Sequence, residues 1–325
     1  MTAEQLPGRL RLMELTELDK MLDLMEVAFA EDSQREGRDI RADMAGVKSL
    51  LPVLRVLMKI KPGFADKFYT LAWEVEGRFV AGITLSQQGN DRQRWYIFNV
   101  ATHPDFRGRG LARKLVSAAL DHVRARHGKR VLLDVRADNV AAYNLYQSAG
   151  FRHLETSITL KGTLARLGGY DYPPGYIVRQ LAAADWQPAY ELEKRLASAA
   201  TQAVCPATPD QFQNGAFAQL IQRVMNRAQK QRVERWLIER AGQPLGVAAS
   251  VVKLAGRNPH HIELTLDPAE ADLAPALLAQ TINRAVNGTP QPFLIDVRAH
   301  SNAIAFLKSI GCEEIETTHQ LGLAV

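Results

Sequence analysis

A short basic turn with two glycines is the part of the sequence best suited to bind a charged ligand. The residues Arg107-Gly108-Arg109-Gly110 follow an apolar stretch and precede a run with helical periodicity. The first turn of a helix carries unpaired backbone N–H groups and roughly half a positive charge, so it binds phosphate groups. Glycine lacks a Cβ atom, and a ligand can therefore approach the backbone closely here. With Arg113 and Lys114 adding positive charge, the pattern predicts a site for a diphosphate.

The spacing of this turn narrows the choice of ligand. It matches neither the glycine-lysine loop of nucleoside triphosphatases nor the three-glycine dinucleotide motif, and no acidic residue is placed to hold a ribose. Instead, Arg107-x-x-Gly110-x-Ala112 resembles the Arg/Gln-x-x-Gly-x-Gly/Ala signature of the GNAT superfamily of N-acetyltransferases, which bind acetyl-CoA there. The segment 139–151, through Asn139, Tyr146 and the pair Gly150-Phe151, resembles the second signature of that family.

The resemblance implies a role for each matching position. Backbone amides of Arg107, Gly108, Arg109, Gly110, Leu111 and Ala112 would hold the diphosphate. The preceding strand end, Val100-Ala101-Thr102, would pair with the pantetheine arm, and the amide of Val100 would polarise the thioester carbonyl. Asn139 would contact the pantetheine or the ribose side. Tyr146 would protonate the leaving thiolate, because a phenol of pKa about 10 is a suitable acid for a thiolate of pKa about 8.5.

The group that accepts the proton of the attacking amine stays open. A primary amine with a pKa of about 10 must lose a proton before it attacks a thioester. Many relatives use a glutamate on the fourth strand, but that strand, Arg94–Val100, contains no carboxylate. Glu31 and Asp32, or Tyr96 acting through water, are the candidates, although loop charges on the surface and a packed tyrosine are the simpler interpretations. His103, which precedes a proline, is expected to be structural.

The elements around these residues alternate between strands and helices. A hairpin is indicated by the turn Glu76-Gly77-Arg78, and Thr16 has the character of a helix N-cap. The pattern favours an α/β (α+β) fold with a mixed, mostly antiparallel twisted sheet flanked by helices. Strands are expected at Arg9–Leu15, Tyr69–Val75, Phe79–Leu85, Arg94–Ala101, Arg130–Val135 and Phe151–Leu160, and helices at 18–29, 40–59, 111–127 and 139–149.

The order of elements begins again after a glycine-rich loop at Gly168–Gly175. The sequence Leu133-Asp134-Val135-Arg136-Ala137 recurs as Ile295-Asp296-Val297-Arg298-Ala299, and Gly246 falls in the second hairpin where Gly82 stands in the first. A repeat of this period predicts two copies of one domain. We expect a catalytic GNAT-like domain at 1–165, a linker at 166–175 and a degenerate GNAT-like domain without the CoA motif at 176–325.

The second copy lacks the pattern that would bind a diphosphate. In place of arginines and glycines it has the acidic stretch Asp267–Asp272, whose carboxylates would repel a diphosphate and whose side chains would block it. Leu307 stands where the first copy has Tyr146. We expect this copy to pack against the first, to shape the acceptor site, or to dimerise. The tandem arrangement resembles mycothiol-synthase-like acetyltransferases, although the active half would differ.

Composition and charge exclude several other classes. The chain has 325 residues, 46% of them hydrophobic and 23% charged, as expected for two globular domains. Cys205 and Cys312 are too few for a disulfide framework or a metal site and fit a reducing cytoplasm. We find neither a signal-peptide pattern nor an apolar run long enough for a membrane. A net charge of +5 without interleaved aromatic residues does not predict nucleic-acid binding.

The sequence therefore predicts a cytoplasmic, acetyl-CoA-dependent N-acetyltransferase without a metal. The acetyl group would pass to a primary amine of a small molecule or peptide by direct attack in a ternary complex, because no cysteine lies near the motif to act as a nucleophile. The alternative is a non-catalytic, acyl-CoA-binding regulatory module, which the missing carboxylate on the fourth strand keeps open. The identity of the amine and self-association into a homodimer also stay open.

Overall fold

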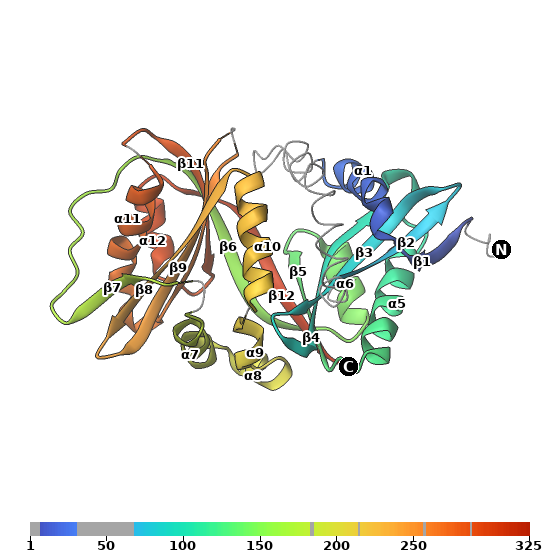
Figure 1. Cartoon of the computed structure of the whole chain (residues 1–325), viewed down its shortest axis with the longest axis horizontal. Coiled ribbons are helices and arrows are strands. Elements are labelled where there is room, and N and C mark those ends of the chain that lie inside the picture. The colour runs from blue at the N-terminus through green and yellow to red at the C-terminus, as the bar shows by residue number, and fades with distance from the viewer. Residues whose placement is uncertain (1–6, 31–67, 183–184, 214, 256–257, 287) are drawn as a thin grey trace. The chain divides into compact units, whose positions relative to one another are not determined.

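The computed structural model describes residues 7–30, 68–182, 185–213, 215–255, 258–286 and 288–325 (Figure 1). The chain divides into two compact units. The first comprises Met1–Asp134, Ala141–Arg152 and Leu321–Val325, and the second comprises Val135–Val140 and His153–Gln320. The helix expected over 40–59 and the candidate bases Glu31 and Asp32 lie outside the described residues.

The first unit is built on a sheet with the strand order β1-β2-β3-β4-β5. Strands β1 to β4 pair antiparallel, and β4 and β5 pair parallel. The last two residues of β5 and the first of α6 belong to the second unit. The elements are β1 (Arg9–Leu12), α1 (Leu18–Ala28), β2 (Phe68–Val75), β3 (Arg78–Gln88), β4 (Asp91–Thr102), α5 (Leu111–Ala125), β5 (Arg130–Arg136) and α6 (Val140–Ser148), with single 3-10 turns at Leu15–Glu17 and Pro104–Phe106.

Helices α1 and α5 pack on opposite faces of this sheet. On one face, α1 covers the row Ala72, Gly82 and Ala101, whose members are paired across β2, β3 and β4. A Cβ atom on Gly82 would lie 2.8 Å from the sulfur of Met21, so glycine lets α1 approach the sheet closely. On the other face, α5 buries its apolar side, which consists of Leu111, Leu115, Val116, Ala119, Leu120 and Val123. The sheet is thereby held rigid on both sides of the β4–α5 connection.

The second unit contains the strand order β12-β6-β11-β10-β9-β8-β7, although the last residues of β12 belong to the first unit. Strands β10 and β11 pair parallel, whereas β6 with β11, β10 with β9, β9 with β8 and β8 with β7 pair antiparallel. The elements are β6 (Arg152–Leu164), β7 (Tyr176–Gln180), α7 (Gln187–Leu196), α8 (Ala199–Val204), α9 (Pro209–Phe212), α10 (Ala216–Ala228), β8 (Gln231–Arg240), β9 (Gln243–Lys253), β10 (His260–Leu266), α11 (Ala274–Ala285), β11 (Gln291–Arg298), α12 (Ala303–Ser309) and β12 (Glu313–Ala324).

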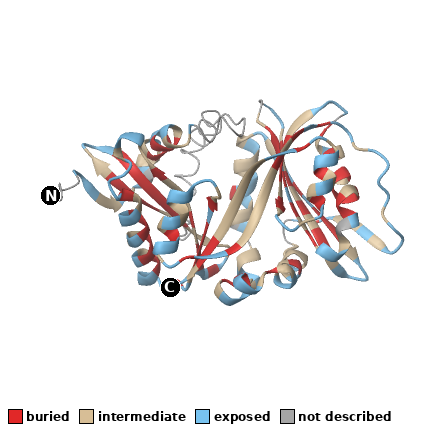
Figure 2. Cartoon of the chain, turned by 180° about the vertical axis from the view of Figure 1, so that it is seen from behind, coloured by how far each residue is buried: buried red, intermediate tan, exposed pale blue. Residues whose placement is uncertain are grey.

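The core of the second unit lies on one face of its sheet. Trp236, Ile238, Ala248, Ile262 and Leu264 point from β8, β9 and β10 into a cluster with the apolar sides of α11 and α12. Figure 2 shows these buried residues along the strands and on the helices that cover them. The alternate residues of the same strands point to the opposite face, as the two-residue period of a strand requires.

The two sequence repeats fold in the same order, and the expected fold class is confirmed as two tandem α/β copies. Both hairpins turn through two residues with positive φ, 48° and 78° at Glu76-Gly77 and 50° and 78° at Ala241-Gly242. Positive φ at both positions is typical of a two-residue hairpin turn. Each unit also contains a segment of the other repeat: β6 pairs with β11 in the second unit, and Val325 in the first donates its N–H to Lys129 at 3.0 Å.

Two local expectations at the start of the chain are wrong. The first strand ends at Leu12, not Leu15. Thr16 is not the helix N-cap, because the chain first forms a 3-10 turn over Leu15–Glu17, capped by reciprocal bonds between Glu14 and Glu17, and α1 begins only at Leu18. Glu14 therefore takes the capping position that the sequence analysis assigned to Thr16. Among the described residues, no helix is long and apolar enough to cross a bilayer.

Candidate functional site

The connection between β4 and α5 begins with a braced 3-10 turn. The backbone N–H of His103 donates to the carbonyl of Val80 at 2.8 Å, and Nδ1 of its ring accepts a hydrogen bond from the N–H of Asp105 at 3.3 Å. Pro104 occupies the first helical position, where its missing N–H costs nothing. His103 therefore has the structural role that the sequence suggested, and it fixes the direction in which the chain enters the glycine turn.

The glycine turn leaves open space beside the start of a long helix. Gly108 and Gly110 both have φ of +75°. Among the described residues other than the chain neighbours of each glycine, no atom lies within 4 Å of the place where a Cβ atom would be. Gly110 is the N-cap of α5, which runs for 15 residues without a side chain capping its first turn. The first N–H groups of α5 thus point to an accessible surface, as a helix N-terminus that binds an anion requires.

The two arginines of the turn hold its shape. The guanidinium of Arg107 donates from Nε to the carbonyl of Thr102 at 3.4 Å and from Nη2 to the carbonyl of Ala28 at 3.3 Å. Arg109 donates from Nη2 to the carbonyl of Asp105 at 3.1 Å and lies over the ring of Phe106. Arg107 thus binds backbone oxygens at the ends of β4 and α1, and Arg109 binds one in the 3-10 turn, so their charges stay beside the glycines.

Strand β4 carries a bulge just before this turn. Gly82 on β3 pairs with Ala101, but Thr84 pairs with Phe98, so β4 has one extra residue in this interval. Asn99 takes a left-handed conformation with φ of 53°, which asparagine tolerates better than most residues. The parallel ladder between β4 and β5 ends at Ile97. From Phe98 to Thr102, the edge of β4 toward β5 is therefore outside the ladder, and this edge includes Val100.

Tyr146 lies on α6 in an apolar environment. Its side chain is 5% exposed, and its ring meets that of Phe151 edge to face at 5.9 Å. Within the described residues, its hydroxyl has no hydrogen-bond partner. Burial raises the pKa of Tyr146 to about 12, because the phenolate would lose its hydration. The phenol therefore keeps its proton throughout the neutral range.

A carboxylate that the sequence analysis missed lies beside Tyr96. The hydroxyl of Tyr96 donates to Oδ2 of Asp134 at 2.5 Å, and Asp134 lies on the neighbouring strand β5 with its side chain exposed. The matching pair in the second copy is His261 and Asp296, at 2.7 Å. The repeated Leu/Ile-Asp-Val-Arg-Ala sequence could have drawn attention to Asp134, since it places an aspartate at matching positions of β5 and β11.

Asn139 is placed differently from the other predicted site residues. It belongs to the segment Val135–Val140 of the second unit, whereas Val100, the glycine turn and Tyr146 belong to the first unit. Its backbone N–H donates to the carbonyl of Arg136 at 3.0 Å, in the turn that precedes α6. The described residues contain no group of three or more histidine, cysteine, aspartate or glutamate side chains that could hold a metal.

The second copy differs from the first at each of these features. Asp267 pairs with Arg195 at 3.0 Å, and Glu270 pairs with Arg240 at 2.7 Å and accepts a hydrogen bond from Tyr176. Strands β9 and β10 pair without a bulge, and the β10–β11 ladder continues to Leu264, two residues beyond the point that matches Ile97. In the second copy, ion-paired carboxylates thus stand where the first copy has its open glycine turn. The strand edge that lies outside the ladder in the first copy is here paired with β11.

Part of the first copy is similar to known acetyltransferases. Residues 38–151 match the model of the acetyltransferase (GNAT) family. A stretch of 55 residues is 46% identical to [ribosomal protein bS18]-alanine N-acetyltransferase of Salmonella typhimurium, and 62 residues are 40% identical to mycothiol acetyltransferase of Saccharopolyspora erythraea. These stretches cover 17% and 19% of this chain, and only 37% and 20% of the two relatives.

The fold of the whole chain also has counterparts among solved structures. A tandem GNAT protein from the clavulanic acid biosynthesis pathway has a TM-score of 0.60 with this chain at 14% sequence identity. The similarity covers 97% of this chain and 98% of that protein. At such low identity, the similarity establishes the tandem architecture of two copies and nothing about the ligand.

Proposed function

We propose that the chain transfers an acetyl group from acetyl-CoA to a primary amine, because residues 38–151 match the model of the acetyltransferase (GNAT) family. The observation that carries this proposal is the open glycine turn at the start of α5. Gly108 and Gly110 leave space for the diphosphate of coenzyme A, and the N–H groups of residues 107–112 would bind it. The charges of Arg107 and Arg109 beside the turn support the same anion.

The free edge of β4 would bind the pantetheine arm. Val100, Ala101 and Thr102 lie beyond the end of the β4–β5 ladder, so an extended ligand can add to this edge as a further strand. The N–H of Val100 would polarise the thioester carbonyl and stabilise the negative charge that develops on its oxygen during attack. The bulge at Asn99 supports this role, because a bulge changes the direction in which the following groups point.

Tyr146 would supply the proton for the leaving group. The amine nitrogen bonds to the carbonyl carbon, the carbon–sulfur bond breaks, and the thiolate sulfur takes the phenolic proton. The raised pKa keeps Tyr146 protonated before the reaction. A leaving thiolate in the same apolar environment would also be a stronger base than in water. Burial therefore raises the pKa of both the phenol that gives the proton and the thiol that forms. Asn139 would contact the pantetheine or the ribose side.

The pair Tyr96 and Asp134 would accept the proton of the amine. The sequence left Tyr96 as one of three candidates, acting through water, and the hydrogen bond to Asp134 supplies the carboxylate that β4 lacks. An ionised carboxylate bonded to a phenol can receive a proton through that phenol. This pair weakens the alternative of a non-catalytic acyl-CoA-binding module, which rested on the missing carboxylate.

The acceptor is proposed only as a class, a primary amine on a small molecule or a peptide. One relative acts on the alanine of a ribosomal protein by its name, and another acetylates mycothiol by its name, so the matched segment occurs with both kinds of acceptor. We propose further that the second copy does not bind coenzyme A, because Asp267 and Glu270 are held by ion pairs where the first copy has its glycines.

Release of free thiol from acetyl-CoA tests the proposed function. The full chain is incubated with a panel of polyamines, amino acids, aminoglycosides and peptides with free N-termini, and acetylated products are identified by mass spectrometry. We expect amine-dependent thiol release with one of these classes and one equivalent of coenzyme A bound per chain by calorimetry. If the chain bound coenzyme A but released no thiol with any amine, the regulatory module would be supported. Two equivalents of bound coenzyme A would contradict the proposal that the second copy does not bind it.

A further inference from the structure

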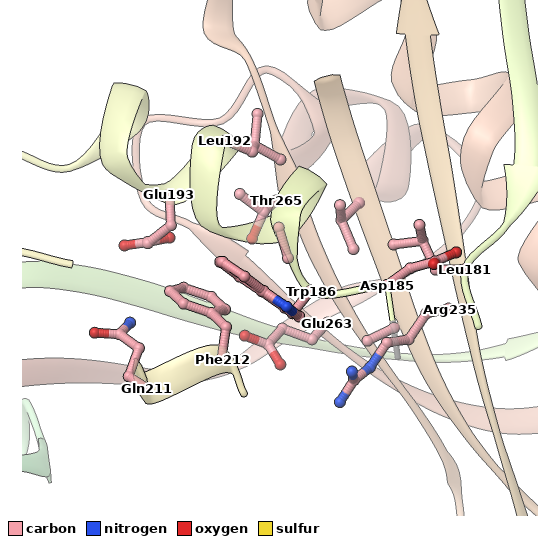
Figure 3. A pocket seen from close by; sticks show the side chains of 13 residues that line it. Leu181, Asp185, Trp186, Leu192, Glu193, Gln211, Phe212, Arg235, Glu263 and Thr265 are labelled. Atoms are coloured by element: carbon pink, nitrogen blue, oxygen red, sulfur yellow. The ribbon is translucent and has the colours of Figure 1, made fainter. Parts of the chain in front are cut away.

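The second unit contains a pocket that none of the proposed catalytic residues lines. It lies on the face of β8, β9 and β10 opposite to the apolar core, between these strands and the helices α7 and α9 (Figure 3). All of its lining residues belong to the second unit, and its volume is about 260 Å³. Pockets for drug-sized ligands have volumes of roughly 300–1,000 Å³, so this one suits a smaller molecule, of the size of an amino acid.

The floor of the pocket presents two opposite charges on either side of a small residue. Arg235 on β8 pairs in register with Ala249 on β9, and Ala249 pairs in register with Glu263 on β10. Residues paired in this way point to the same face, and two strand spacings put the Cα atoms of Arg235 and Glu263 roughly 10 Å apart. The short side chain of Ala249 leaves the space between them open.

These two charged side chains have no bonded partner among the described residues. The other carboxylates of the lining have partners: Glu193 pairs with Arg298 at 2.5 Å, and Asp185 pairs with Arg179 at 3.5 Å. Among the described residues, the side chains of Glu263 and Arg235 form no ion pair or hydrogen bond with the protein. The pocket therefore offers one anion and one cation to a ligand.

The side chain of Glu263 is exposed toward the pocket, with charged groups of both signs around it. The surrounding protein atoms raise its pKa, and the nearby carboxylates of Asp296 and Glu193 raise the pKa further, whereas His261 and Arg235 lower it. A ligand that brings a positive charge would supply the bonded partner that Glu263 lacks among the described residues.

One wall of the pocket is aromatic and apolar. The rings of Trp186 and Phe212 face the cavity, and Tyr190 lies behind them, with its ring centroid 6.0 Å from that of Trp186 and 5.9 Å from that of Phe212. The rest of the apolar lining consists of Leu181, Ala189, Leu192, Val247 and Ala249. In Figure 3 the carboxylate of Glu263 lies near these rings, and the guanidinium of Arg235 lies apart from them.

We propose that this pocket binds a small zwitterion, namely a free amino acid with an apolar or aromatic side chain. Its ammonium group would bind Glu263, its carboxylate would bind Arg235, and its side chain would pack against Trp186 and Phe212. Hydrogen bonds between ionised groups are the strongest that a protein offers a ligand of this size. The ligand would be bound and not acetylated in this unit, because ion-paired carboxylates replace the glycine turn here.

Binding to the full chain without acetyl-CoA tests this inference independently of acetyl transfer. The twenty amino acids are compared by thermal shift at millimolar concentration, and the best apolar or aromatic one is then titrated by calorimetry. For L-phenylalanine, the comparison compounds are phenethylamine, which lacks the carboxylate, and N-acetyl-L-phenylalanine, which lacks the ammonium. We expect each of these to bind about tenfold to a hundredfold more weakly than the amino acid, as expected for one lost charge-assisted hydrogen bond.

Substitutions locate the ligand and show how it is oriented. Glu263→Gln should weaken the amino acid and the amine alike, whereas Arg235→Gln should weaken the amino acid and leave the amine unchanged. Glu313→Gln and Arg223→Gln, which alter exposed charges of the same unit away from the pocket, are the matched controls and should change nothing. The proposal is overturned if no amino acid shifts the melting temperature, if the amine binds as tightly as the amino acid, or if Glu263→Gln folds normally and binds with unchanged affinity.

Discussion

The hydroxyl of Tyr96 donates a hydrogen bond of 2.5 Å to Oδ2 of Asp134, across the parallel ladder that joins β4 to β5. This bond places a carboxylate next to the point where the two strands stop pairing. A similar hydrogen bond occurs in the second copy, where His261 and Asp296 occupy the matching positions. Both copies therefore have a hydrogen-bonded aspartate at this position of the sheet. Only the first copy has the open glycine turn beside it.

The substitution Asp134→Asn tests whether this carboxylate accepts the proton of the amine. General base catalysis contributes about a hundredfold to ten-thousandfold to a rate, so kcat should fall by at least about a hundredfold. Asp121→Asn changes an exposed carboxylate on α5 and serves as the control, which should keep the parent kcat. An unchanged kcat in Asp134→Asn would assign the base to another group.

The glycine turn can be tested by a matched pair of substitutions. Gly110→Val and Gly242→Val both place a branched residue at a positive φ, 75° and 78°, in open space. Each should lose about 1–2 kcal/mol or more of unfolding free energy, because a Cβ atom disfavours the left-handed conformation. Only Gly110→Val should also abolish binding of coenzyme A, measured by calorimetry. Equal affinity in the two variants would contradict the diphosphate assignment.

The substitution Tyr146→Phe separates acid catalysis from binding. It removes a hydroxyl that has no hydrogen-bond partner in the described part of the chain and keeps the ring that packs on Phe151, so the fold should be retained. We expect kcat to fall by about a hundredfold or more while the dissociation constant of coenzyme A stays nearly constant. Tyr143→Phe, one turn earlier on the same helix, should turn over normally. If Tyr146→Phe were as active as the parent, the thiolate would take its proton from water or from another residue.

The sequence predicted the parts of the site that depend on local chemistry. The turn around Gly108 and Gly110, the start of α5 and the place of Tyr146 on a helix follow from residue type and spacing over a few positions. Asp134 could not be placed beside Tyr96 in the same way, because their contact depends on the register of a parallel ladder between strands separated by a helix. The bulge at Asn99 has the same origin, since it exists only relative to the partner strand β3.

The pocket of the second unit was missed for a related reason. Arg235, Ala249 and Glu263 come from three strands and form one row only through their register. The aromatic wall comes from two helices, α7 and α9, and their sequences carry no motif. The pairing of β6 with β11 also could not be predicted from the sequence, because β6 could equally have paired with a strand of its own repeat.

An ion-pair cluster at the start of the chain should make the first unit sensitive to acid. Arg11 donates to Glu17 at 2.6 Å and to Glu74 at 2.7 Å, and these bonds lower the pKa values of both carboxyl groups, that of Glu74 to about 2. A folded-state pKa below the unfolded value means that stability is present above the unfolded pKa of about 4.3 and is lost as the pH falls toward 2. Glu74→Gln should therefore flatten the fall of the melting temperature between about pH 4.5 and pH 2. Glu76→Gln, an exposed carboxyl in the adjacent turn, should leave the slope unchanged. Parallel curves for all three proteins would show that the cluster is too hydrated to stabilise the unit, as is common for ion pairs at a surface.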